Sequence, residues 1–383
     1  MVQTGGAAVA ANTVLLVGSN SEDSVRPGAI SATDWQYSLF ASWSGGAFVP
    51  GWGTHGAYVC AGTGGHNAPE NYDAVLFDFA DYTWKYLPNT NGVAANPAPV
   101  QSGQTNGSPW YEISGTEVPA PSHCYKHAIG IGNVFYKTIN EFVLPTASTS
   151  DRSHKYTLNA NNTGTWARAA SNSSYAAFPG FGTYGGSDSA TAIYDALRNR
   201  IWHLTAMTHY VSSMPWLNVA TGVWSGTSVT GLTPESNGRA LHIYDADADC
   251  VYFGLTSGQL YRMNLSGSPL TYTAVSSTNT ASIGMSGPTE GTRWHKYPVA
   301  DGGDGCFYTY NDNGSKQLKK FDPSTRVFST VTVANGPAIP RVNPGGAIYS
   351  NQATHFTRFC YVPARKCFAW IPGNGQQVAL LRP

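Results

Sequence analysis

The feature that most constrains this chain of 383 residues is a short pattern that occurs five times. Each copy has an apolar residue, an Asp or Asn, a polar stretch and then an aromatic residue six to eight positions after the Asp or Asn. An Asp or Asn at this place favours a turn, because its side chain accepts hydrogen bonds from the following backbone. Each copy therefore predicts a strand, a tight turn and a strand that opens with a ring. The copies are Phe77-Asp78 with Trp84, Leu158-Asn159 with Trp166, Leu217-Asn218 with Trp224, Met263-Asn264 with Tyr272, and Phe321-Asp322 with Phe328.

A second pattern, typical of a hairpin, precedes the later copies. Residues 193–202 and 243–252 each pass from an apolar segment through a polar turn into another apolar segment, and 297–308 and 361–370 follow the same order. Apolar residues at helical spacing do not persist for three turns anywhere in the chain. Units of four strands, here named a to d in chain order, bury both sheet faces by stacking around an axis. The sequence thus predicts an all-β fold, a six-bladed β-propeller of four-stranded antiparallel blades.

The last of the six predicted blades lacks a d strand, and we expect the N-terminus to supply it. Residues 33–39 resemble the d strand at 82–87, so a ring closed by this N-terminal strand is predicted. Residues 29–383 then form a single propeller domain, and residues 1–28 an arm or docking segment outside it. An alternative count of seven blades uses 110–113. The six blades are predicted at 43–88, 122–170, 187–228, 236–275, 292–332 and 344–383.

Residues 33–383 resemble the kelch and galactose-oxidase type of propeller. The resemblance rests on Gly64-Gly65, which follow the b strand of the first blade, and on the aromatic pattern. Most blades lack the kelch double glycine. Copper chemistry of the galactose-oxidase type requires Tyr and His ligands at the axis and a modified Cys–Tyr pair, and the chain shows no diagnostic spacing for them.

The composition excludes several classes of function. Charged residues make up 11% of the chain, against roughly 25% in an ordinary soluble domain. A net charge of zero without a basic run argues against nucleic-acid binding. No window approaches 18 consecutive apolar residues, so we expect no membrane insertion. Residues 1–17 lack a positive n-region and make a poor signal peptide.

Two local patterns suggest chemistry without the full requirements for it. Cys360 and Cys367 lie symmetrically about a two-residue turn, where either a cross-strand disulfide or packed reduced thiols would fit. Asp245, Asp247 and Asp249 imitate half of a calcium loop but lack the Gly and Glu that complete one, which favours a solvated turn. We therefore predict no metal site, no cofactor and no catalytic residue.

The long segments of the chain lie between b and c strands or between d and a strands. In a four-stranded meander both kinds of connection leave the same face, and long loops on a rigid scaffold commonly carry binding. The aromatic side chains in these long segments suit stacking on sugars or on a protein partner, although they could instead anchor the loops to the blades. The candidate binding residues are His66, Trp110, Tyr111, Tyr175, Phe178, Phe181, Tyr184, His209 and Tyr210.

A second candidate site is the central channel. His242 and His295 occupy equivalent positions of two a strands, each two residues before a Tyr, and Arg239 and Arg293 precede them. We expect these four side chains to approach the axis. Inward imidazoles can hold a metal or an anion, or can line a polar channel filled with water.

These expectations point to a non-enzymatic structural or attachment protein of a virion, from a tailed bacteriophage. Low charge and abundant Gly, Ser, Thr and Asn are typical of phage appendages, and assembly in the host cytoplasm requires no signal peptide. The expected partners are other virion proteins, through the N-terminal arm or one propeller face, and a glycan or protein of the host surface. The alternatives are a secreted, extracellular carbohydrate-active enzyme with galactose-oxidase-like architecture, and a lectin.

Overall fold

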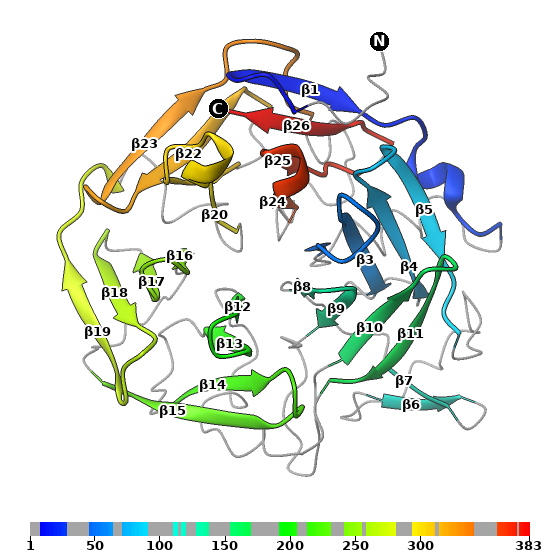
Figure 1. The fold of residues 1–383 in the computed structure, drawn as a ribbon, viewed down its shortest axis with the longest axis horizontal. Helices are drawn as coiled ribbons and strands as arrows, with labels where there is room; N and C mark the ends of the chain where they lie inside the picture. Colours follow the sequence, from blue (N-terminus) through cyan, green and yellow to red (C-terminus); the bar gives the residue numbers. More distant parts are fainter. Residues whose placement is uncertain are drawn as a thin grey trace.

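The structure is a computed structural model whose described residues consist almost entirely of strands and turns (Figure 1). The helical segments among them are the short 3-10 helices η1 (Glu22–Val25), η4 (Val299–Asp301) and η5 (Pro363–Arg365). None of the described helices is long and apolar enough to cross a membrane. The described residues are 8–28, 46–63, 71–90, 110–113, 116–119, 128–137, 154–169, 191–204, 213–230, 241–254, 258–280, 293–310, 314–340, 358–373 and 375–383.

The described strands form six four-stranded antiparallel sheets, here numbered sheets 1 to 6, and one separate hairpin. Sheet 1 contains β2 (Ala47–Val49), β3 (Ala57–Thr63), β4 (Asn71–Asp78) and β5 (Thr83–Leu87). Sheet 2 contains β8 (Ala128–Ile131), β9 (Val134–Lys137), β10 (His154–Asn159) and β11 (Thr163–Arg168). Sheet 3 contains β12 (Thr191–Asp195), β13 (Arg200–Leu204), β14 (Ser213–Asn218) and β15 (Trp224–Thr230).

The remaining sheets follow the same order of strands, except that the N-terminus contributes to the last one. Sheet 4 contains β16 (Leu241–Asp245), β17 (Cys250–Gly254), β18 (Leu260–Asn264) and β19 (Leu270–Val275). Sheet 5 contains β20 (His295–Lys296), β21 (Phe307–Thr309), β22 (Gln317–Asp322) and β23 (Val327–Thr332). Sheet 6 contains β24 (Phe359–Val362), β25 (Cys367–Trp370), β26 (Val378–Arg382) and β1 (Thr13–Val17). The hairpin is β6 (Trp110–Ile113) with β7 (Thr116–Pro119).

The sheets are arranged in a ring with the first strand of each nearest the centre (Figure 1). First strands of neighbouring sheets contact one another, namely β2 with β8, β8 with β12, β16 with β20, β20 with β24, and β24 with β2. Each of the six interfaces between neighbouring sheets has its own apolar cluster. The core is therefore a circle of six interfaces, and each sheet is covered on both faces.

The outer edge of the ring is joined by backbone hydrogen bonds between sheets. The residue that follows one outer strand pairs in parallel with the outer strand of the next sheet, as Asn89 does with Gly164 and Thr278 with Val327. β15 and β19 pair in the same way and merge sheets 3 and 4 into one eight-stranded sheet. Because these pairings are parallel, the outer strands all run in one direction, and equivalent turns of different sheets lie at the same end of the ring.

The recurring aromatic pattern has the predicted structure. Each of its five rings lies in a fourth strand and is at most 4% exposed. The Asp or Asn before the turn makes the expected bonds: Asn218 accepts from the backbone of Ala220, and Asp322 accepts from that of Ser324. The prediction of four-stranded antiparallel sheets is confirmed, with bounds close to those expected. Residues 110–113 belong to a two-stranded sheet and not to a further four-stranded one among the described residues.

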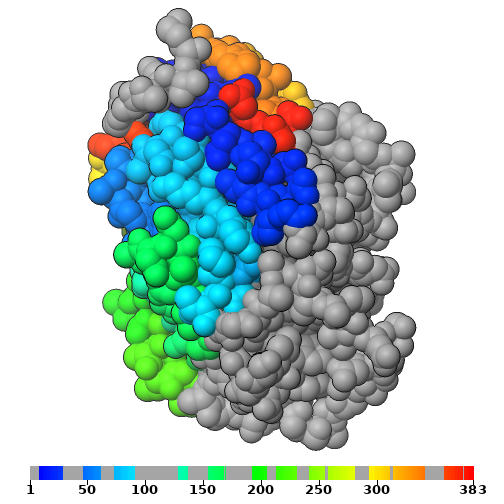
Figure 2. Space-filling model, turned by 90° about the vertical axis from the view of Figure 1, so that its right-hand side faces the viewer, coloured from blue at the N-terminus to red at the C-terminus, as the bar shows by residue number. Residues whose placement is uncertain are grey.

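The strand that closes the last sheet comes from the N-terminus, as predicted, but it is a different segment. β1 pairs with β26 from Thr13 opposite Arg382 to Val17 opposite Val378. Residues 13–17 thus belong to the ring and not to an arm outside it, while 33–39 lie outside the described residues. Figure 2 shows the blue N-terminal residues against the red C-terminal strand and the cyan residues of sheet 1.

The closing strand was predicted at 33–39 because the prediction looked for an aromatic residue at the start of the strand. Val14, opposite Leu381, occupies the position that Trp84 occupies opposite Phe77 in sheet 1. Val14 is 1% exposed and lies in the apolar cluster between sheets 5 and 6. A β-branched residue fills this place as well as a ring does, so a search for rings missed the closing strand.

Candidate functional site

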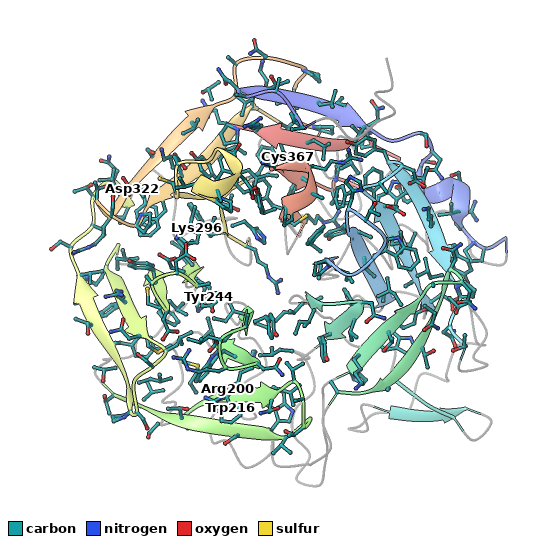
Figure 3. The ribbon with its side chains drawn as sticks, in the orientation of Figure 1. Arg200, Trp216, Tyr244, Lys296, Asp322 and Cys367 are labelled. Carbon is teal, nitrogen blue, oxygen red and sulfur yellow. The ribbon has the colours of Figure 1, made fainter. Side chains whose placement is uncertain are left out.

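One end of the ring carries the short turns between first and second strands and between third and fourth strands; we call it the short-turn face. Polar contacts cross from sheet to sheet there, and Lys296, which makes two of them, is labelled in Figure 3. Arg198 of sheet 3 donates to both carboxylate oxygens of Asp249 in sheet 4, at 2.7 and 2.6 Å. Lys296 of sheet 5 donates to Asp245 and Asp247 of sheet 4, at 2.8 Å each. All three aspartates of the D-x-D-x-D run are therefore used in ion pairs between sheets.

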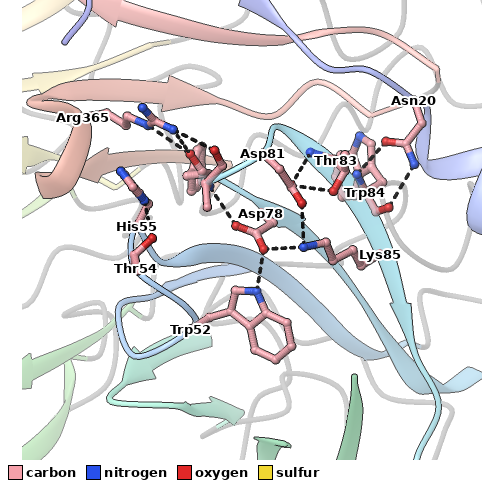
Figure 4. Close-up of polar contacts among 12 residues, drawn as sticks. Asn20, Trp52, Thr54, His55, Asp78, Asp81, Thr83, Trp84, Lys85 and Arg365 are labelled. Atoms are coloured by element: carbon pink, nitrogen blue, oxygen red, sulfur yellow. Dashed lines mark hydrogen bonds and ion pairs between the residues drawn. The ribbon is translucent and has the colours of Figure 1, made fainter. Parts of the chain in front are cut away.

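The junction between the last and the first sheet is bonded at the same end (Figure 4). The guanidinium of Arg365 is 1% exposed; it donates to the backbone oxygens of Phe79 and Ala80 and lies over the ring of Tyr82. Asp78 accepts from Trp52 at 3.0 Å and from Lys85 at 2.6 Å. These contacts fix the short-turn face as a rigid base for the ring.

Several buried polar atoms near the axis of the ring lack hydrogen-bond partners. Arg293 lies just before β20 in sheet 5, and its Nη2 donates to the backbone oxygen of Ala192 in β12 of sheet 3, at 3.2 Å. Its Nε is buried and has no partner. Tyr58 of sheet 1 and Cys360 of sheet 6 are near enough to influence its charge. The guanidinium is therefore close to residues from several sheets, as expected of a group at the axis. Burial lowers the pKa of Arg293 to about 10.

His242 lies in β16, the first strand of sheet 4, and the first strands are nearest the centre of the ring (Figure 1). It is 8% exposed, packs edge-on against Phe253, and its Nε2 has no partner. Burial lowers the pKa of its imidazole to about 3. His203, on β13, is opposite Ala192 in the register of sheet 3, and burial together with the neighbouring His242 holds its pKa well below the usual value. Both rings are therefore neutral near pH 7.

His295 follows Arg293 by two residues in the same extended segment. Its ring hydrogen-bonds the backbone of Phe359, while its Nε2 is buried without a partner. Burial, and then the positive charge of Arg293, lower the pKa of this imidazole to about 3. The structure places Arg293 close to His295, and His242 close to His203, while Arg239 lies outside the described residues.

We call Arg293, His295, His242 and His203 the axial cluster. His203 is the one of these four residues that was not predicted from the sequence. The signal was its place in β13, where a titratable side chain follows Ile201 and Trp202 in an otherwise buried strand. No group of three or more His, Cys, Asp or Glu residues in the described part of the chain is arranged to hold a metal ion. The chemistry that the cluster offers is one guanidinium charge among neutral imidazoles.

The end of the ring opposite the short-turn face is here called the loop face. Most of the residues predicted to bind there lie outside the described residues. Trp110 and Tyr111 lie in β6, opposite Pro119 and Val118 of β7, so they belong to a strand and not to an irregular loop. β7 contacts the outer strand of sheet 2. The others lie outside the described residues: His66, Tyr175, Phe178, Phe181, Tyr184, His209 and Tyr210.

The cysteines in the described part of the chain are free and buried. Cys367 is opposite Val362 in sheet 6, and Cys360 is opposite Ala369, so the two thiols are not a directly opposed pair. Burial raises the pKa of the Cys367 thiol to about 12. Of the two alternatives considered, the structure contains packed, reduced thiols.

Comparison with known proteins identifies no family for this chain. No family model matches the sequence, and no curated protein matches it significantly. One similar solved structure is that of an auxiliary nutrient binding protein from Bacteroides ovatus, with a TM-score of 0.47 and 12% identity. The match covers 89% of this chain and 69% of that chain. At this TM-score the similarity carries no conclusion about fold or activity.

Proposed function

We propose that the ring is a six-bladed β-propeller of the kelch and galactose-oxidase type, and that it serves as a non-enzymatic binding protein. In this proposal it is a structural or attachment protein of a tailed-phage virion, which contacts a protein or a glycan through its long connections. The observation that carries the proposal is the unequal length of the connections. Turns on the short-turn face, such as 196–199 and 246–249, span a few residues, whereas the opposite end connects β5 to β8 across residues 88–127.

This division supports a scaffold with one variable face. The short turns are bonded to their neighbours by Arg198, Lys296 and Arg365, so these three cations are already used in contacts between sheets. Long connections on a rigid framework are the usual place for recognition. The candidate rings at Trp110 and Phe181 belong to two successive connections of this kind.

The experiment pairs a loop-face double variant, Trp110→Ala with Phe181→Ala, with a matched control on the other face. Arg198→Ala is unsuitable as the control because it breaks ion pairs between sheets. Leu197→Ser is suitable, since Leu197 is 77% exposed on the short-turn face. One hot-spot ring costs about 2 kcal/mol or more, so the double variant should bind host cells or a glycan array at least about thirtyfold more weakly.

Three results would contradict the proposal. The first is unchanged binding by the double variant together with weaker binding by Leu197→Ser. The second is a fall in thermal stability that accounts for all of the lost binding, because the rings would then only anchor loops. The third is oxidation of a primary alcohol by the copper-loaded protein, which would favour the enzyme alternative. Mass spectrometry of purified phage particles tests the virion assignment separately: the chain should be among their proteins.

A further inference from the structure

The charge of Arg293 is not balanced within the described structure. The groups that influence its pKa are its own burial, Tyr58 and Cys360, and none of them is a carboxylate. Its one hydrogen bond to Ala192 leaves the Nε without a partner. A buried cation without a counter-charge is costly, because it has lost its hydration and gained no ionic partner. Because Arg293 has only one hydrogen bond to a backbone oxygen, it keeps donors with which it can bind an anion.

Neighbouring polar atoms are placed to complete a site. Arg293 and His295 are two residues apart in an extended segment, so their side chains leave the same face of the chain. The Nε2 of His295 is buried without a partner, as is the Nε2 of His242 from the neighbouring sheet. Ala192, which accepts from Arg293, is opposite His203, and His203 is close enough to His242 for their charges to interact. Arg293 is thus placed beside His295 and His203 beside His242, and Ala192, which is bonded to Arg293 and opposite His203, lies between the two pairs.

We propose that this axial cluster of Arg293, His295, His242 and His203 binds a small carboxylate anion at the centre of the ring. The planar guanidinium matches the two oxygens of a carboxylate. The imidazoles add polar atoms but no charge at neutral pH, so the site carries a single positive charge and suits a monoanion. This site is separate from the loop face and does not depend on the function proposed above.

The test uses the full chain with sodium acetate as the probe and sodium sulfate as the dianion for comparison, each titrated against sodium chloride at constant ionic strength. Acetate should raise Tm along a saturating curve, and calorimetry should give the same half-saturation concentration. Sulfate should act more weakly than acetate. A stronger effect of sulfate would replace the monoanion site with one for a tetrahedral dianion and so overturn the proposal.

The variants separate a ligand site from a structural arginine. Arg293→Met should weaken acetate binding by at least about tenfold. Its Tm without acetate should be equal to that of the wild type or higher, since replacing a buried, unpaired charge with an apolar side chain is commonly neutral or stabilising. Arg326→Gln removes an exposed charge from the same sheet and should leave the acetate curve unchanged.

Contrary results are equally clear. A Tm that rises in proportion to acetate with no saturation, or a saturating curve that persists in Arg293→Met, means that the channel holds only water. If Arg293→Met fails to fold, Arg293→Lys decides, because it keeps the charge and loses the planar fork. Weaker acetate binding by Arg293→Lys supports the site, and unchanged binding refutes it.

Discussion

Arg365 at the junction of sheets 6 and 1 and Arg293 at the axis are both poorly hydrated cations, yet they are bonded very differently. Arg365 makes three hydrogen bonds to two backbone oxygens and stacks on Tyr82 at 4.7 Å. Arg293 makes a single bond of 3.2 Å and keeps an unpartnered Nε. Arg365 uses Nε and Nη2 to hold two sheets together and leaves its buried Nη1 without a partner, whereas Arg293 has one hydrogen bond among the described residues and retains more capacity for another molecule.

The same difference holds for the two regions as a whole. The interfaces between sheets are filled with apolar and aromatic side chains, such as Tyr252 of sheet 4 against Phe321 of sheet 5, with ring centroids 5.1 Å apart. At the axis, buried ring nitrogens of His242 and His295 lack partners. Buried polar atoms are usually satisfied, so the unpartnered nitrogens of His242, His295 and Arg293 make the axis a candidate site. Apolar packing between the sheets holds the ring together, whereas the polar groups at its centre can bind a ligand.

The largest loss of stability is expected from deletion of residues 1–18, which removes β1 from the interfaces of the ring. The deletion uncovers β26, whose Leu380 and Leu381 are fully buried, and leaves an open sheet edge. We expect aggregation or loss of a cooperative unfolding transition in calorimetry. Deletion of residues 1–7 keeps β1 and should preserve the transition. A monomeric, cooperatively folded product of the longer deletion would show that the ring does not need this strand.

Arg365→Met should have the next largest effect. It removes three hydrogen bonds and leaves two backbone oxygens of sheet 1 without their donor, which costs about 2 to 3 kcal/mol of the free energy of unfolding. Urea denaturation measures the loss. Arg293→Met is the matched variant and should lose nothing. Equal destabilisation by the two substitutions would remove the distinction between interface and axis.

A smaller effect is expected on the stability of the protein at acidic pH. The pKa of His242 is about 3 in the folded protein and near 6.5 when unfolded, so between these values only the unfolded chain binds the proton. Stability is therefore lost as pH falls from about 6.5 toward 3, by up to about 1.4 kcal/mol per pH unit for this imidazole. His242→Phe should flatten the fall measured by urea denaturation between pH 7 and pH 4.5. An unchanged slope would mean that the ring is not buried as described.

The smallest effect is expected at the short-turn face. The pair of Arg198 and Asp249 is bidentate and partly exposed, so a double-mutant cycle with Arg198→Ala and Asp249→Ala should give a coupling energy of about 1 kcal/mol. Raising the salt concentration should reduce it. A coupling energy near zero would indicate that apolar packing alone holds sheets 3 and 4 together.

The sequence predicted the sheets well because their signals are local. An Asx turn such as the one at Asp322 and a buried ring such as Phe328 lie within a few residues of each other, and each sheet repeats the arrangement. The closing strand was predicted in kind and misplaced along the chain. It forms by contact across the whole chain, between Val14 and Leu381, and no local pattern distinguishes Thr13–Val17 from other aliphatic segments.

The axial cluster shows the same limit. His242 and His295 were found because they precede a Tyr in equivalent strands, which is a repeated local feature. His203 lies in a second strand, and only the folded register places it opposite Ala192, near His242. The lack of a carboxylate beside Arg293 likewise depends on residues far apart in sequence and was not predictable from spacing.

Hydrogen exchange of the backbone amides in β1 tests the central claim most directly, that the N-terminal strand makes the ring one cooperative unit. If β1 is part of that unit, its amides bonded to β26 exchange with the same free energy of opening as amides in β25, at the level of global unfolding. Destabilisation by urea should lower both equally. Exchange from β1 at a much lower free energy, with β25 still protected, would mean that the ring stands without its closing strand and would contradict this account.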